Sequence, residues 1–129
     1  MKSVFLLPLL ALGLGFPALA QPGEPDREAE LERLLAGWDE AGPPVRCLNL
    51  RRATIVRVVN RTAIVFRLGG ALYVMRPAAG ADALDRRDAI VSRFNSYMCD
   101  GELIELADPY SGVQRLLRAG PFIPYRRPG

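Results

Sequence analysis

The chain has 129 residues, of which 50% are hydrophobic, and a formal net charge of +3 with no histidine. This length suits one small domain with a modest core. Without histidine, Ser-His and Cys-His catalysis and the ordinary zinc sites are excluded, so we expect no enzyme, no metal site and no cofactor.

Residues 1–20 have the layout of a secretory signal peptide. A cation at Lys2 precedes an uncharged apolar run, and Ala18-Leu19-Ala20 supplies the small side chains of a cleavage site. The alternative is an uncleaved anchor, but prolines and glycines interrupt a run that is already short for a membrane span. We expect cleavage after Ala20, no transmembrane segment in the mature chain, and a periplasmic or secreted protein.

Residues 21–44 are expected to form a short linker and one acidic amphipathic helix. Acidic side chains crowd the opening turns, where they favour the helix dipole, and Gly42-Pro43-Pro44 ends any helix that reaches this point. Apolar side chains follow at helical spacing at Leu31, Leu34, Leu35 and Trp38. We expect this stripe to cover one face of a sheet, and a helix that binds a partner is the alternative.

Residues 45–129 are predicted to form a small β-rich domain around the segment 53–76. Three runs of β-branched and aromatic residues, split by Asn60-Arg61 and Gly69-Gly70, predict antiparallel strands joined by two-residue turns. That register pairs Arg57 with Ile64. It also places a set of residues on one face, namely Ile55, Val59, Ile64, Phe66, Tyr73 and Met75. Both faces have apolar centres, so each needs a cover.

The remaining segments add strands and an irregular crossover. Further strands are expected at residues 46–50, 102–107 and 113–117, followed by an extended tail after residue 118. The crossover is expected to bury Ala89, Ile90, Val91 and Phe94. The predicted fold is therefore mainly β, of the α+β class: a small antiparallel sheet of five or six strands, curled or closed into a barrel, with one N-terminal amphipathic helix.

Charge is distributed unevenly along the chain. Residues 24–40 carry seven acids and two arginines, whereas residues 45–80 carry seven arginines and no acid. The acidic helix can neutralise the sheet internally, which we favour, or the arginines can face an anionic ligand. Arg51, Arg52 and Arg61, at a strand junction and a turn, are the candidates for anion contact, while Arg57 is expected to need a carboxylate from the helix.

Cys47 and Cys99 are the two cysteines of the chain. An even pair in a chain that is expected to be exported predicts a disulfide, which would close a loop of about 52 residues. A reactive thiol is the alternative, but the chain has no C-x-x-C spacing and no histidine that could activate a thiolate.

Short motifs in a fixed order suggest a relationship to known proteins. They are Cys47-Leu48-x-Leu50-Arg51, Phe66-Arg67, Gly69-Gly70, Tyr73, Met98-Cys99-x-Gly-x-Leu-Ile and Gly120-x-Phe122. This order resembles a family of short, exported bacterial domains of unknown function, over roughly residues 47–122. Members often carry two further cysteines, where this chain has Ala81 and Leu117, and their joint absence supports pairing of the remaining two. Met75 stands where the family usually has Asn, and the resemblance implies no activity.

Two classes of function remain. The first is an exported, non-catalytic envelope module that binds an envelope protein or a surface, which fits the size, the expected export and the missing catalytic set. The alternative is a binder of anionic lipid, glycan or another polyanion that uses its arginines. Nucleic acid is the weakest partner, because export removes it and the aromatic residues Phe66 and Tyr73 are expected in the core. The sequence leaves the oligomeric state open.

Overall fold

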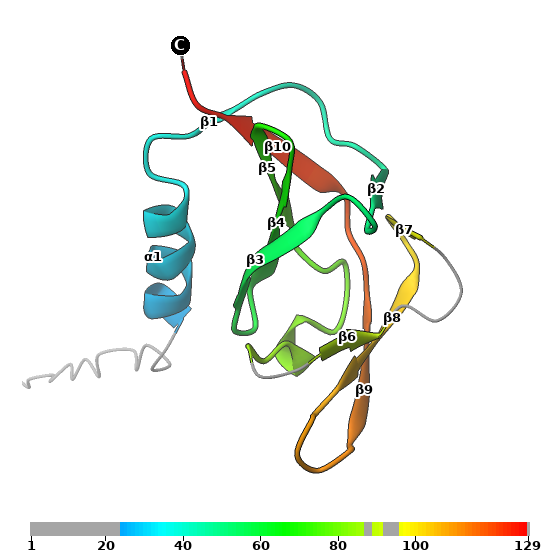
Figure 1. The fold of residues 1–129 in the computed structure, drawn as a ribbon. Coiled ribbons are helices and arrows are strands. Elements are labelled where there is room, and N and C mark those ends of the chain that lie inside the picture. The colour runs from blue at the N-terminus through cyan, green and yellow to red at the C-terminus, as the bar shows by residue number, and fades with distance from the viewer. Residues whose placement is uncertain (1–23, 87–88, 92–95, 129) are drawn as a thin grey trace, which may run out of the picture.

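A computed structural model describes residues 24–86, 89–91 and 96–128 (Figure 1). The predicted signal peptide and Phe94 lie outside these residues. The described chain contains one α-helix, α1 (Glu24–Leu34), a 3-10 turn, η1 (Ala81–Ala83), and three antiparallel sheets.

The largest sheet has five strands. In spatial order they are β1 (Asp39–Glu40), β10 (Phe122–Arg126), β5 (Ala71–Met75), β4 (Ala63–Leu68) and β3 (Thr54–Val59). A two-stranded sheet joins β2 (Cys47–Asn49) and β7 (Tyr97–Cys99). The third sheet has the order β6 (Ala89–Val91), β8 (Leu103–Ala107) and β9 (Gln114–Arg118).

The predicted mainly β fold with an antiparallel sheet is confirmed, but the arrangement of its strands differs from the prediction. The strands divide among three sheets, and the described five-stranded sheet has two open edges, β1 and β3, so it does not close into a barrel. Strands such as β1, β2, β6 and β7 have only two or three residues, too few for an alternating pattern to be recognised. The segment 89–91, expected to be part of an irregular crossover, forms β6, in which Ile90 is partly buried.

The predicted register is correct across the second turn of the meander and wrong near the first. Phe66 pairs with Tyr73 and Ile64 with Met75, as expected for a two-residue Gly69-Gly70 turn. Across the first turn, however, Arg57 pairs with Val65 rather than with Ile64, because the loop 60–62 has three residues.

Two local features explain the shifted register. Arg61 adopts a backbone φ of 58°, a conformation that residues other than Gly, Asn and Asp rarely take. A bulge between Ile55 and Arg57 then restores the predicted pairing of Ile55 with Phe66. As a result, Val58 and Val59 exchange faces relative to the prediction, and Arg57 lies on the face that α1 covers.

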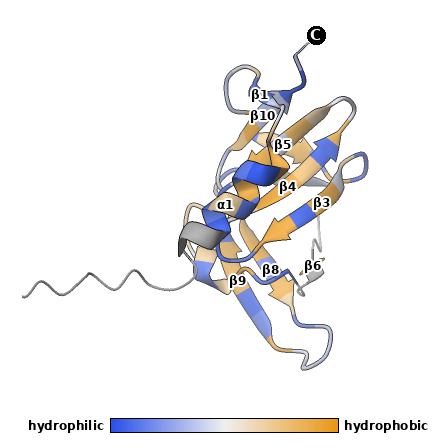
Figure 2. Cartoon of the chain, turned by 90° about the vertical axis from the view of Figure 1, so that its left-hand side faces the viewer, coloured by the Kyte–Doolittle hydropathy of each residue, from blue (hydrophilic) through white to orange (hydrophobic). Residues whose placement is uncertain are grey.

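Helix α1 covers one face of the five-stranded sheet (Figure 2). The core on this side consists of Leu31, Val59, Ala63, Val65, Leu72 and Val74, and the predicted stripe residues Leu34, Leu35 and Trp38 pack against it. The helix ends earlier than expected, because Gly37 adopts a φ of 85°, a common way to stop a helix. Asp39 and Glu40 therefore belong to strand β1, which pairs with β10.

The other face carries the larger core. Its buried members are Leu48, Val58, Ile64, Phe66, Met75, Leu84, Met98, Ile104, Leu106, Leu117, Ala119 and Phe122. The rings of Phe66 and Phe122 meet edge to face, with centroids 5.8 Å apart. Gly120 is required just before β10, because a Cβ at that position would overlap the backbone carbonyl oxygen of Arg76.

Candidate binding pocket

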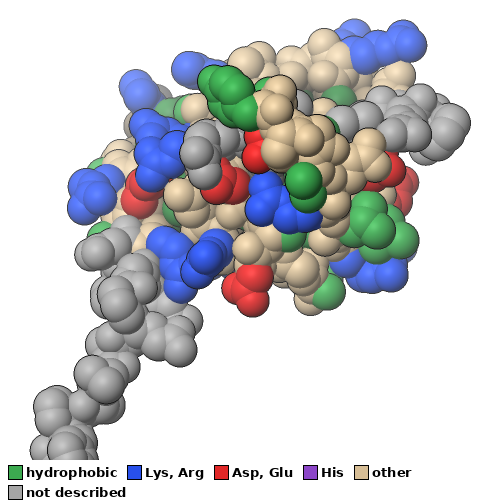
Figure 3. All heavy atoms as spheres, turned by 90° about the horizontal axis from the view of Figure 1, so that it is seen from below, with side chains coloured by type: hydrophobic (Ala, Val, Ile, Leu, Met, Phe, Trp, Pro, Cys, Tyr) green, Lys and Arg blue, Asp and Glu red, His purple; other side chains and the backbone are tan. Residues whose placement is uncertain are grey.

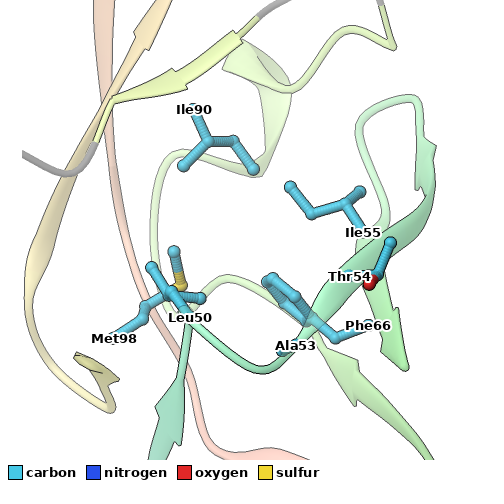
Figure 4. Close-up of a pocket in the computed structure, with 7 residues that line it drawn as sticks. All are labelled: Leu50, Ala53, Thr54, Ile55, Phe66, Ile90 and Met98. Atoms are coloured by element: carbon cyan, nitrogen blue, oxygen red, sulfur yellow. The ribbon is translucent and has the colours of Figure 1, made fainter. Parts of the chain in front are cut away.

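An apolar pocket of about 530 Å³ lies between β3 and β6 (Figure 4). It is lined by Leu50, Ala53, Thr54, Ile55, Phe66, Ile90 and Met98. Phe66 and Met98 are buried and form the inner part of the pocket. Ile55 lies at the rim of the pocket and is 43% exposed. The lining side chains are apolar apart from Thr54, and exposed polar atoms also border the pocket. A pocket of this volume with a mixed lining is typical of sites that hold a small molecule or a side chain of a partner.

Both strands beside the pocket are sheet edges. β3 ends the five-stranded sheet and β6 ends the three-stranded sheet, and among the described residues β3 pairs only with β4. In an edge strand, alternate residues direct their N–H and C=O groups away from the sheet. Val56, next to Ile55, is also 43% exposed, so apolar side chains and open backbone groups lie together on this strand.

The turn between β2 and β3 places Arg51 and Arg52 at one end of the pocket. Both are exposed, and they lie between the lining residues Leu50 and Ala53. Asn49 fixes this turn, because its side-chain oxygen accepts a hydrogen bond from the Arg51 N–H at 2.9 Å and its backbone carbonyl accepts bonds from Arg52 and Ala53 at 3.2 and 3.0 Å. Neither guanidinium forms an ion pair with another residue in the part of the chain that the structure describes.

Arg61 lies at the opposite end of β3. It is exposed, and its backbone N–H donates to the carbonyl of Leu84 at 3.1 Å. The six residues of β3 separate it from Arg52 by about 20 Å of extended chain. The structure therefore brings two of the three predicted anion-contact residues together and leaves the third apart.

The predicted disulfide between Cys47 and Cys99 is confirmed, with an S–S distance of 2.06 Å. The two cysteines oppose each other directly in the β2-β7 pair. Met98 precedes Cys99, and Leu50 follows β2 and donates its N–H to the Ser96 carbonyl at 2.6 Å. The disulfide thus fixes the part of the chain that supplies one wall of the pocket.

The acidic helix pairs with Arg57 and Arg76, two of the seven arginines in residues 45–80, and with Arg86, so the internal interpretation of the charge pattern holds for only part of the set. Arg76 donates two hydrogen bonds to Glu28, at 2.8 and 3.0 Å, and these bonds hold the pKa of the Glu28 carboxyl below its usual value. Glu30 lies 3.9 Å from Arg57 and 3.8 Å from Arg86. These arginines have their carboxylates within the protein, in contrast to Arg51 and Arg52.

Of the acidic residues around β8, Asp108 has a clear structural role. Asp108 accepts hydrogen bonds from the N–H groups of Tyr110 and Ser111, at 2.8 and 3.4 Å, and so holds the β8-β9 turn. In the described residues, no three His, Cys, Asp or Glu side chains are grouped as a metal ion would require. No helix of the described part is both long and apolar enough to cross a membrane.

The β8-β9 hairpin offers a second exposed apolar surface. Its exposed hydrophobic residues are Leu103, Tyr110, Val113 and Leu116. Seen from below in Figure 3, hydrophobic side chains form separate groups between charged ones rather than one continuous patch. The pocket beside β3 is the more defined site, because it combines a partly open hollow with an open sheet edge.

No family model matches the chain, and searches of curated proteins and of solved structures also found no match. The resemblance to exported bacterial domains stays a prediction. The sequence pointed to the arginines and the disulfide, but not to the pocket, because its lining comes from strands whose relative placement no local pattern specifies. In the sequence, the adjacent apolar residues Ile55 and Val56 could have indicated an apolar surface at this strand.

Proposed function

We propose that this protein is an exported, non-catalytic binding module that holds an extended segment of another envelope protein between β3 and β6. The observation that carries the proposal is the apolar pocket of about 530 Å³ beside the edge of β3. An apolar side chain of the partner fills the pocket, while the partner backbone bonds to the edge of β3. The signal-like residues 1–20 and the disulfide support a location outside the cytoplasm.

The exposed strand β3 favours an extended peptide as the ligand. An apolar sheet edge that is left open invites pairing with another chain, and a partner would cover Ile55 and Val56. The bulge at Val56 interrupts regular pairing, so the partner is expected to pair mainly with Ala53–Ile55, next to the pocket. A short, side-chain-anchored contact is the expected result.

Peptide display tests the proposal. Random eight-residue peptides are selected on the purified protein, and the affinities of enriched peptides are measured by fluorescence anisotropy. We expect an apolar residue at a fixed position, and a loss of affinity of about tenfold or more in Ala53→Phe, which fills the pocket. Arg61→Ala, at the far end of β3, is the control and should bind normally.

The backbone part of the contact has its own test. N-methylation of alternate amides in an enriched peptide removes donors without changing its side chains, so strand addition predicts that one set of alternate positions is sensitive and the other is not. Equal binding by wild type and the well-folded Ala53→Phe variant, or no enrichment at all, would overturn the proposed function.

The predicted alternative, a binder of anionic lipid or glycan, has less support. A polyanion surface requires several cations close together, whereas Arg51 and Arg52 are separated from Arg61 by the length of β3. Three other arginines are already paired with α1. Strongly salt-dependent binding to heparin or anionic vesicles, lost when the three candidate arginines are replaced, would favour this alternative.

A further inference from the structure

We infer that the pocket selects a peptide with a carboxylate next to its apolar anchor, and that Arg51 and Arg52 bind this carboxylate. The inference rests on the proposed function, since it names the chemistry of the segment held in the same pocket. The carboxylate comes either from an acidic side chain or from the free C-terminus of the partner. Both have the same charge and the same pair of oxygens.

The position of the two arginines follows from the chain itself. Leu50 and Ala53 line the same part of the pocket, on the side away from Ile90 (Figure 4), and Arg51 and Arg52 are the two residues that connect them. Each arginine is the sequence neighbour of a lining residue, so its Cα atom lies about 3.8 Å from the Cα atom of that residue. A ligand whose side chain enters the pocket has its neighbouring groups within reach of these long side chains.

Charge complementarity points to an anion at this place. Three arginines, Arg57, Arg76 and Arg86, have carboxylates of α1 at 2.8 to 3.9 Å. By contrast, Arg51 and Arg52 are adjacent like charges with no ion-pair partner among the described residues, and residues 45–80 supply no acid. An external carboxylate would relieve their mutual repulsion, and a guanidinium can bind both of its oxygens at once.

The turn is also organised before any ligand arrives. Asn49 holds the backbone of Arg51, Arg52 and Ala53 through three hydrogen bonds, so binding must order only the two side chains. The apolar pocket beside the turn favours a ligand with one apolar group and one charge. A highly charged polymer would make no use of that pocket.

Matched peptides test the inference by fluorescence anisotropy. Peptides of eight residues carry one Leu or Phe anchor with Asp, Asn or Ala at each neighbouring position, and a parallel set ends at the anchor as a free acid or as an amide. For wild type we expect one acidic position to improve affinity by about tenfold over its neutral counterpart. The Asp set and the free-acid set distinguish the two sources of the carboxylate.

Protein variants assign the preference to the arginines. In Arg51→Ala/Arg52→Ala the acidic and neutral peptides should bind equally, whereas Arg61→Ala should keep the full preference and Arg51→Lys/Arg52→Lys a part of it. Thermal melting should show that all three variants remain folded, because exposed charges contribute little stability.

The outcomes separate this inference from the proposed function. Neutral and acidic peptides that bind wild type equally, but lose affinity in Ala53→Phe, would retain the pocket and overturn the carboxylate site. A preference that survives in Arg51→Ala/Arg52→Ala would also overturn it. Absence of peptide binding, together with binding to phosphatidylglycerol vesicles that needs both arginines, would overturn the peptide assignment and the proposed function together.

Discussion

The two faces of the five-stranded sheet are covered in different ways. On one face, α1 packs Leu31 onto a small core, and ion pairs from Glu28 and Glu30 join the helix to the sheet and to Arg86. On the other face, the cover consists of two further sheets whose strands come from distant parts of the chain. This second cover includes the disulfide, and it leaves the pocket beside β3.

The difference shows how stability and binding divide between the faces. The cover on the other face needs one long closure, the pairing of β2 with β7 across a sequence separation of 52 residues, and this closure costs chain entropy. The larger core and the covalent link offset that cost. The face that is hardest to assemble is thus also the one with space for a ligand.

The largest expected effect contrasts one buried side chain from each face. Phe122→Ala should lower the free energy of unfolding by about 4 kcal/mol, because it empties a fully buried site and removes the contact with Phe66. Leu31→Ala should cost about 3 kcal/mol, since a smaller side chain is lost from the smaller core. Urea denaturation of both variants measures the difference, and a costlier Leu31→Ala would reverse our ranking of the faces.

The disulfide should give the next largest effect. The 52-residue separation corresponds to about 4 kcal/mol of loop entropy, and we expect a measured loss nearer 3 kcal/mol in Cys47→Ala/Cys99→Ala, because unfolded chains retain some structure. Amide chemical shifts should change around Leu50 and Met98 and stay constant in α1. Equal chemical-shift changes around Leu50 and Met98 and in α1 would mean that the disulfide stabilises both faces of the sheet rather than one.

The smallest effect concerns the ion pair between Glu28 and Arg76. The pKa of Glu28 is lowered by its hydrogen bonds to Arg76, so the stabilisation is present above the unfolded pKa and is lost as pH falls through the folded pKa. Since both side chains are about half exposed, Glu28→Gln should cost less than about 1 kcal/mol at neutral pH.

The pH profile of that variant gives the decisive comparison. Its difference from wild type in free energy of unfolding should shrink towards zero as pH falls through the folded pKa of Glu28, below which the carboxyl is protonated in both states. Glu32→Gln, exposed on the same helix, is the control and should show a smaller difference throughout. A constant difference across the whole pH range would indicate that packing, not charge, holds this edge of α1.

Local patterns predicted what depends on neighbouring residues. The apolar stripe of α1, the Gly69-Gly70 turn and the disulfide all followed from spacing and residue type. The first turn was misjudged because Arg61 adopts a positive φ that its side chain disfavours, and only the surrounding structure, including the bond to Leu84, imposes it.

Strand β10 was missed for a different reason. The segment after residue 118 was expected only to be extended, and Pro124 within it is a residue type that central strands usually exclude, since proline cannot donate within a sheet. The Pro124 carbonyl accepts a hydrogen bond from the Ala41 N–H, so the polar backbone groups of Pro124 face β1 and not β5. The two residue pairs of β1 with β10 involve Tyr125 and Arg126, so the absent N–H of Pro124 costs no hydrogen bond in either pairing. The pocket could not be predicted either, because it depends on how two separate sheets are placed.

The place of β10 has a consequence for how the molecule is made. β10 follows every other strand along the chain, yet it lies inside the sheet, between β1 and β5. During synthesis, the meander β3-β4-β5 can form early from local hairpins, while β5 keeps an unpaired edge. The sheet is completed only when Phe122–Arg126 emerges, so until then the unpaired edge of β5 is open to pairing with other chains.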